Sequence, residues 1–198
     1  MAKIAIIGGT GHLGKAIARR LVKAGHAVAI GSRTADKASA CAEEIGASAH
    51  GENAGVASGQ DVVIVTVPHA SQGETLDQIR DHVGAAVLVD TTVPLVPPKV
   101  MRVQLPAEGS AAQQAAARLG PGIRLVSAFH NVAAHVLDTD ARVECDVLVF
   151  SDHVEARTTV IGLCADMELR GLSGGSLANA AAAEALTSIL IYLNKPYK

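Results

Sequence analysis

A glycine-rich turn near the start of the chain constrains its fold more than any other feature. The apolar run IAII over residues 4–7 precedes the turn, and this pattern is typical of a strand buried on both faces of a parallel sheet. Gly9, Gly11 and Gly14 follow in G-x-G-x-x-G spacing, and a helical stretch over residues 15–23 comes next. Gly9 can permit a tight turn, Gly11 a close approach of the backbone to a pyrophosphate, and Gly14 close packing of the helix on the strand. The spacing therefore predicts a dinucleotide site with the phosphates at the N-terminus of that helix.

The end of the next expected strand, residues 27–30, indicates which dinucleotide binds. Ser32 and Arg33 stand where an NAD site usually places Asp or Glu to accept from the ribose 2′-hydroxyl. Lys37 follows one helical turn later. An acidic side chain would repel a 2′-phosphate, whereas Ser32 and Arg33 can donate to it. The alternative is a solvated turn with unrelated basic residues, but the position at a strand end favours NADP over NAD.

Composition limits the other ligand classes. The 198 residues carry a formal net charge of −2, which offers no basic surface for nucleic acid. The three cysteines share no metal-ligand spacing, and their odd number suits reduced thiols in a cytoplasm. No secretory signal pattern precedes the first strand, and polar residues interrupt the apolar stretch 177–193. We therefore expect a soluble cytoplasmic protein that neither spans nor binds a membrane.

Strands and helices are expected to alternate along the whole chain. After the first strand and helix, apolar runs predict strands at 27–30, 61–68, 86–90, 124–128, 146–150 and 168–172. Helices are predicted at 36–45, 76–83, 110–119, 153–164 and 176–193. This alternation is typical of a Rossmann-type α/β fold, a doubly wound parallel sheet, here with a small C-terminal helical extension. The segment His69–Gly73 is expected to be a loop at the carboxyl end of the sheet, where such folds bind ligands.

The order of these pieces resembles a known family, the coenzyme F420-dependent NADP oxidoreductases. The resemblance spans nearly the whole chain. The segments that carry it are GGTGHLGKAIARRL at 8–21, GSRTADKA at 31–38, DVVIVTVP at 61–68, LVSAFHNVAA at 125–134, CDVLVFSD at 145–152 and the pattern L-x-N-x-x-x-x-E-x-L-T at 177–187. The first two segments are common to many NADP-binding folds, and the later ones narrow the match to this family and its relatives.

The resemblance implies a homodimeric enzyme that passes hydride between C4 of the nicotinamide of NADP(H) and C5 of the deazaflavin ring of F420. Residues 1–128 would form the NADP-binding domain, and residues 129–198 would complete the sheet, the acceptor cleft and the dimer interface. His130 would match the segment that contacts the deazaflavin. It is the candidate catalytic residue, because an imidazole there can donate to a carbonyl of the acceptor ring. The residues expected to bind the cofactors are Gly9, Thr10, Gly11, His12, Leu13, Gly14, Ser32, Arg33, Lys37, Val67, Pro68, His69, Ala128, Asn131 and Val132.

Two other functions are compatible with the same residues. One is an NADPH-dependent reductase of another acceptor, such as a flavin, a ferric chelate or a small carbonyl compound. The other is a non-catalytic NADP-binding sensor. Hydride transfer between two carriers requires no catalytic acid that a sequence would reveal, so the residues alone leave these functions open. For His130 the alternative is a structural imidazole that satisfies a backbone group at the strand end.

The last expected helix predicts a subunit interface. It carries Leu177, Leu186, Ile189, Leu190 and Leu193 together with a run of alanines. This is more apolar surface than an exposed terminal helix usually presents. As the resemblance implies, we expect the helix to pack in a two-fold dimer and to help cover the nicotinamide end of the cleft.

Overall fold

The computed structural model describes residues 1–196, in which an eight-stranded sheet has the order β3-β2-β1-β4-β5-β6-β7-β8. The strands are β1 (Lys3–Ile7), β2 (Ala27–Ser32), β3 (Ala49–Glu52), β4 (Val62–Val65), β5 (Val87–Asp90), β6 (Arg124–Ser127), β7 (Asp146–Phe150) and β8 (Arg170–Gly175). The helices are α1 (His12–Lys23), α2 (Ala35–Ile45), α3 (Asn53–Ala57), α4 (His69–Val83), α5 (Ala111–Leu119), α6 (Ala134–Leu137), α7 (Val154–Asp166) and α8 (Ala180–Leu193). The predicted α/β fold is confirmed.

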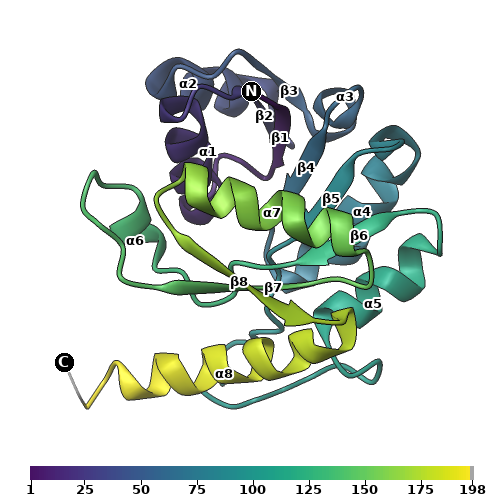
Figure 1. Cartoon of the computed structure of the whole chain (residues 1–198), viewed down its shortest axis with the longest axis vertical. Helices are drawn as coiled ribbons and strands as arrows, with labels where there is room; N and C mark the ends of the chain where they lie inside the picture. Colours follow the sequence, from purple (N-terminus) through teal and green to yellow (C-terminus); the bar gives the residue numbers. More distant parts are fainter. Residues whose placement is uncertain (197–198) are drawn as a thin grey trace.

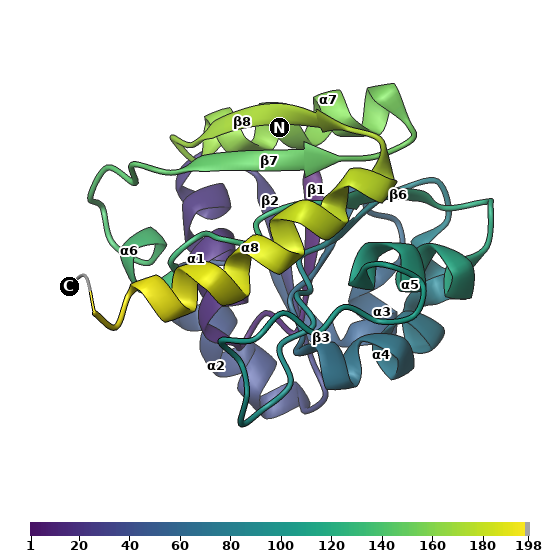
Figure 2. The ribbon, with the colours of Figure 1, turned by 90° about the horizontal axis from the view of Figure 1, so that it is seen from below.

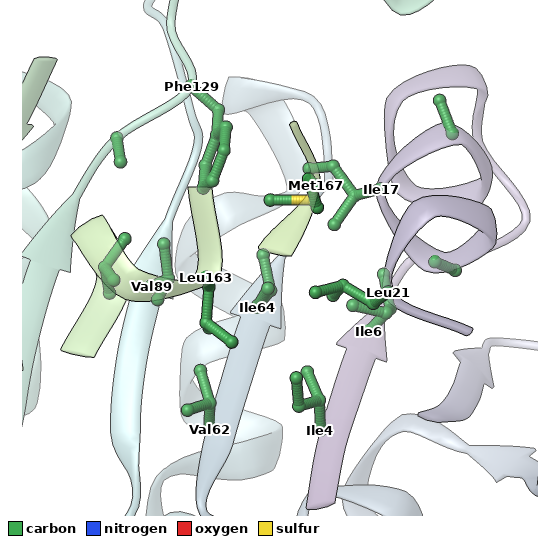
Figure 3. Packing of buried hydrophobic residues seen from close by; sticks show 14 of the residues in the cluster. Ile4, Ile6, Ile17, Leu21, Val62, Ile64, Val89, Phe129, Leu163 and Met167 are labelled. Carbon is green, nitrogen blue, oxygen red and sulfur yellow. The ribbon is translucent and has the colours of Figure 1, made fainter. Parts of the chain in front are cut away.

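The apolar runs of the central strands are buried on both faces, as expected. Along β1, Ile4 and Ile6 join a cluster with residues of α1, α2 and α7. Ala5 and Ile7 point to the opposite face and join a second cluster with residues of α3, α4 and α5. Figure 3 shows the first cluster, in which side chains of β1 and β4 face Leu21 of α1. Alternate residues of one strand therefore supply two separate cores.

The helices cover the sheet in two layers, and α8 lies apart from most of them. In Figure 1, α1 and α2 lie at the upper end of the view, whereas α8 extends along the lower end beyond β7 and β8. One contact that fixes α8 is a hydrogen bond from Thr187 Oγ1 to His130 O, 3.1 Å long. Because His130 follows the carboxyl end of β6, α8 packs at the ligand-binding edge of the sheet.

The sheet is not parallel throughout, which corrects the expectation of a uniformly parallel arrangement. β7 runs antiparallel to β6, through the pair Ser127 and Phe150, and β8 then runs parallel to β7. The connection from β6 to β7 contains the four-residue α6, whereas the crossover of a parallel pair usually contains a longer helix that covers a face of the sheet. The expected division at residue 128 falls just before this change of direction, and it stays a prediction because the sheet continues through it.

The segment expected to be a loop after Pro68 is helical. α4 begins at His69 and continues to Val83 without interruption, so the predicted loop His69–Gly73 is wrong. Ser71 and Gly73 suggest a turn when the sequence is considered alone, but packing against the sheet overrides this weak local preference. Leu76 and Ile79 are fully buried under the sheet and provide that packing.

The C-terminal helix is shorter than expected. A 3-10 turn, Leu177–Asn179, precedes α8, which begins at Ala180 and ends at Leu193. Ala180, Ala183 and Glu184 lie buried on its inner face. No helix of residues 1–196 combines the length and apolar character needed to cross a membrane.

Candidate functional site

The turn between β1 and α1 depends on three glycines. Gly8 has a φ of +73°, in the left-handed region that suits glycine, and its carbonyl accepts from the Gly11 N–H over 3.0 Å, so Gly9 lies at a central position of the tight turn, as expected. Gly9 is required by space, because a Cβ there would lie 2.8 Å from Ile6 O. A Cβ on Gly14 would lie 2.9 Å from Gly9 Cα, which confirms the close packing of α1 expected from the motif. The Gly9 N–H donates to Gly31 O over 2.9 Å and ties the turn to the end of β2.

The N-terminus of α1 leaves backbone donors free at this turn. The first bond within the helix runs from the Lys15 N–H to Gly11 O, 2.9 Å long. The preceding N–H groups, those of His12, Leu13 and Gly14, have no intrahelical acceptor. No side chain caps the helix, and its first turn holds no acidic residue. These donors and the positive end of the helix dipole fit a pyrophosphate, to which His12 and Leu13 would contribute through their backbone.

Two unpaired cations lie at the end of β2. Arg33 and Lys37 are exposed and line the same cleft as the glycine turn. Within residues 1–196, neither has a carboxylate oxygen within 4.0 Å. Ser32 is 6% exposed, and its Oγ accepts from the Thr34 N–H over 3.4 Å. A 2′-phosphate bound here would meet two positive charges and a hydroxyl.

These segments share a cleft of about 500 Å³. It lies at the carboxyl ends of β1 and β4, where the strand order reverses, which is where doubly wound sheets bind ligands. The expected residues that line it are Thr10, Gly11, Ser32, Arg33, Lys37, Val67 and Pro68. Residues that line it without having been expected are Gly8, Thr34, Asn53, Thr66, Ser71 and Thr75.

The unexpected lining residues hold the cleft in shape as well as forming its walls. Asn53 Oδ1 accepts from the Gly8 N–H over 3.4 Å, and Thr66 Oγ1 donates to Ile7 O over 2.9 Å. Ser71 and Thr75 lie four residues apart on α4, so they share one helix face. That spacing could have identified them, but only if α4 had been expected to begin at His69.

The segment expected to meet the acceptor forms a tight turn after β6. Ala128 and Val132 are buried in the core, and the Asn131 Nδ2 donates to Cys145 Sγ over 3.7 Å. Phe129 has a φ of +66°, which is rare for a bulky side chain and persists only where the surroundings hold it. Because β6 is separated from β4 by β5, the turn lies two strands along the edge from Pro68 and does not line the 500 Å³ cleft.

The imidazole of His130 lies under the surface, although the expected donation to the acceptor ring would require it to face a cleft. His130 is 6% exposed, its Nε2 lies 2.7 Å from Ser127 Oγ, and its ring packs against Phe150 at a centroid distance of 5.9 Å. Burial lowers the pKa of His130 from 6.5 to about 4. The side chain is therefore a neutral imidazole at pH 7, bonded within its own turn.

His69 lies beside the cleft with its imidazole turned toward α5. Its Nε2 lies 3.1 Å from Gln114 Oε1, and the ring borders a smaller cavity with Gln72 and Arg118. Only its neighbour Pro68 lines the larger cleft. The expected contact between His69 and the cofactors therefore stays a prediction.

The cysteines offer no reactive or metal-binding group. Cys41 and Cys164 are buried within α2 and α7, and burial raises the pKa of all three thiols, that of Cys164 to about 12. In the part of the chain from 1 to 196, no three His, Cys, Asp or Glu side chains are grouped to hold a metal ion. The expected cytoplasmic location stays a prediction.

Comparison with known proteins identifies the family. Residues 3–94 match the family described as NADP oxidoreductase, coenzyme F420-dependent. An F420-dependent NADP reductase of Methanothermobacter thermautotrophicus is 40% identical over 206 residues, which cover 97% of this chain and 89% of the relative. The chain belongs to this family. A second family member, the F420-dependent NADP reductase of Methanocaldococcus jannaschii, is 36% identical over 211 residues, which cover 99% of this chain and 94% of the relative.

Solved structures agree on the fold of this F420-dependent oxidoreductase family member. A crystal structure from Arthrobacter sp. FB24 has a TM-score of 0.85 at 24% identity and covers 98% of this chain and 93% of its own. A 3-hydroxyisobutyrate dehydrogenase of Mycobacterium tuberculosis has a TM-score of 0.74 at 17% identity, with 98% of this chain and 61% of its own covered. At these identities the likeness concerns the fold alone.

Proposed function

We propose that this protein transfers hydride between NADP(H) and the deazaflavin coenzyme F420. The observation that carries the proposal is the cleft between β1 and β4, where free N–H groups of α1 lie together with the cations Arg33 and Lys37. This combination fits a dinucleotide that carries a 2′-phosphate. The identity of the acceptor rests on the relatives named F420-dependent NADP reductase, which are 36–40% identical over nearly the whole chain.

The dinucleotide side of the reaction requires binding and orientation. We assign the pyrophosphate to the backbone N–H groups at the start of α1, and the 2′-phosphate to Ser32, Arg33 and Lys37 with help from Thr10. Val67 and Pro68 would then form the shelf under the nicotinamide, because they follow β4 on the other side of the switch point. The two carriers supply the reactive atoms, C4 of the nicotinamide and C5 of the deazaflavin, so the protein has to hold the two rings together and exclude water.

We assign the acceptor side to the turn Ala128–Val132. The buried, neutral imidazole of His130 favours a positioning role, in which its bond to Ser127 holds the turn that the acceptor ring meets. The φ of +66° at Phe129 needs such support, because a non-glycine residue adopts this conformation only when its surroundings impose it.

We also propose that two copies associate through α8. Leu186, Ile189 and Tyr192 on this helix are 42%, 45% and 56% exposed, and Leu193 is 39% exposed. Apolar side chains gathered on one exposed helix face are typical of an interface. Light scattering at micromolar concentration should give about 40 kDa, twice the chain mass of 20.2 kDa. A 20.2 kDa particle would contradict the dimer.

An acceptor screen tests the proposed reaction. NADPH is mixed with the protein and with F420, FMN or a ferric chelate, and its oxidation is followed by absorbance. We expect rapid oxidation with F420 and little with the other two acceptors. Protein that binds NADPH but transfers no hydride to F420 would overturn the proposal. Turnover with FMN or the ferric chelate would then indicate a reductase of another acceptor, and no turnover at all would indicate a sensor.

A further inference from the structure

Two buried carboxylates, outside the residues assigned above, hold the ends of one long connection. The first is Asp90, the last residue of β5, which is 1% exposed. Its Oδ1 accepts from the Thr92 N–H over 3.1 Å and from the Thr92 hydroxyl, and its Oδ2 accepts from Gln72 Nε2. Asp90 therefore fixes the first residues of the connection between β5 and α5.

The second carboxylate is Glu184 on α8, also 1% exposed. It accepts from the Ala111 N–H over 2.6 Å and from the Ala112 N–H over 3.1 Å, at the first turn of α5. Gln72 Nε2, which donates to Asp90, also donates to Ala111 O over 3.1 Å and so links the two carboxylates. Both ends of the connection 91–110 are thus held by one buried polar cluster, which we call the Asp90–Glu184 clamp (Gln72, Asp90, Thr92, Ala111 and Glu184).

The clamp lies between the two halves of the site. The Thr91 N–H donates to Val65 O over 3.2 Å, and Val65 leads directly to the Val67–Pro68 shelf. On the other side, the Ala128 N–H donates to Asp90 O over 3.2 Å, at the start of the His130 turn. Figure 2 shows the chain from β5 to α5 leaving the sheet on the side where α8 passes. The first residues of the connection therefore lie between the nicotinamide shelf and the acceptor turn.

We propose that Asp90 and Glu184 are positioning residues, which set the connection 91–110 against the acceptor side of the cleft and so tune acceptor binding without touching the cofactors. This inference rests on the proposed function for its kinetic part only. The hydrogen bonds that define the clamp involve four separate elements, β5, α4, α5 and α8, so releasing either carboxylate frees one end of the connection. The groups assigned above to the NADP phosphates follow β1 and β2, and none of them belongs to this cluster.

The charge on the clamp depends on pH. Burial raises the pKa of Glu184 to about 7, against the lowering effect of the N–H groups of α5, and the neighbouring Asp90 raises it further. Burial also raises the pKa of Asp90, while Thr92, Gln72 and the nearby His69 of α4 oppose the shift. Opening the clamp to water would let Glu184 ionise at its ordinary pKa of 4.5, so ionisation favours the open form. The clamp therefore loosens as the pH rises through 7.

Three variants test the clamp in the full-length protein. Glu184→Ala removes both acceptors, Glu184→Gln keeps one acceptor but cannot ionise, and Glu155→Ala on the exposed surface of α7 is the matched control. In hydrogen exchange, Glu184→Ala should lower the protection of amides in 105–118 at least about tenfold, because the N–H groups of Ala111 and Ala112 lose their buried acceptors. Wild-type protection, corrected for intrinsic exchange, should fall between pH 6 and pH 8, and Glu184→Gln should abolish that dependence.

The kinetic readout separates positioning from general destabilisation. Glu184→Ala should raise the KM for F420 at least about threefold while the Kd for NADPH stays at the wild-type value. If Glu184→Ala does not fold, Thr92→Val releases the other end of the connection. This variant should also raise the KM for F420 and leave the Kd for NADPH unchanged. Unchanged protection in 105–118, or equal effects on F420 and NADPH, would overturn the clamp. Hydrogen exchange and NADPH binding test the clamp even if the acceptor proves not to be F420. The clamp and the proposed reaction with F420 can therefore fail separately.

Discussion

The two sides of the site use polar groups in opposite ways. On the dinucleotide side, Arg33 and Lys37 are exposed and unpaired within the described residues, and N–H groups at the start of α1 are left without intrahelical acceptors. On the acceptor side, His130, Asp90 and Glu184 are all buried and bonded to other groups of the protein. The first arrangement recognises an anion directly. The second holds backbone in place, which suits a reaction whose reactive atoms belong to the two carriers.

The largest effect should come from closing the dinucleotide side. Gly14→Val would place a Cβ 2.9 Å from Gly9 Cα and 3.1 Å from Gly8 O, both backbone atoms that cannot move cheaply. We expect NADPH affinity to fall at least about 100-fold, or the protein not to fold, as measured by fluorescence titration and thermal melting. Gly162→Ala in α7 is the control, because a Cβ there meets nothing within 4 Å. Wild-type NADPH binding by Gly14→Val would contradict the close approach of α1 to the turn.

A smaller and more selective effect is expected from the free cations. Arg33→Ala removes a charge-assisted donor to the 2′-phosphate, so the Kd for NADPH should rise about 10–100-fold while the Kd for NADH changes little. Isothermal titration with both cofactors gives the two constants. Equal affinities of the wild-type protein for NADPH and NADH would contradict the assignment of Ser32, Arg33 and Lys37 to the phosphate.

On the acceptor side, His130→Ala should affect turnover with F420 and NADPH binding differently. We expect turnover with F420 to fall at least about tenfold while NADPH binding remains nearly intact, because the turn that meets the acceptor loses its internal bond to Ser127. Melting temperature and steady-state rate are to be measured on the same preparation. A lower melting temperature with unchanged turnover per folded molecule would show that the imidazole is structural only.

The sequence predicts the dinucleotide side well because its signals are local. The glycine spacing, the Ser32-Arg33 pair and the buried strand that ends at Pro68 each lie within a few consecutive residues, and all three lead into one cleft. Gly9 lies in the turn as the motif predicts, and the positive φ of Gly8 beside it is seen only in the backbone angles.

The acceptor side was predicted less completely because long-range contacts build it. Glu184 meets Ala111 across 73 positions, and Thr187 meets His130 across 57. The helical start at His69 depends on packing under the sheet, and β7 reverses after a connection in which the helix α6 has four residues. The motif at 177–187 includes Glu184 and Thr187, but a motif does not reveal which distant residues they contact. The burial of His130 was missed for the same reason, since its position at a strand end does not reveal the direction of its ring.

The smallest predicted effect is a pH-dependent stability difference that tests the buried side alone. The pKa of Glu184 is about 7 in the folded protein and 4.5 ordinarily, so between these values the folded state binds a proton that the unfolded state has released. The stability that Glu184 contributes is therefore fully present below about pH 4.5 and is lost as the pH rises through about 7. Glu184→Gln cannot ionise, so its stability does not fall with pH through this group. The melting temperature of Glu184→Gln minus that of wild type should be about 3–8 °C higher at pH 8 than at pH 5. Asp90 and His130 are present in both proteins, so the difference between the two melting temperatures reports the contribution of Glu184. A difference that does not change with pH would contradict a buried carboxyl that titrates near 7.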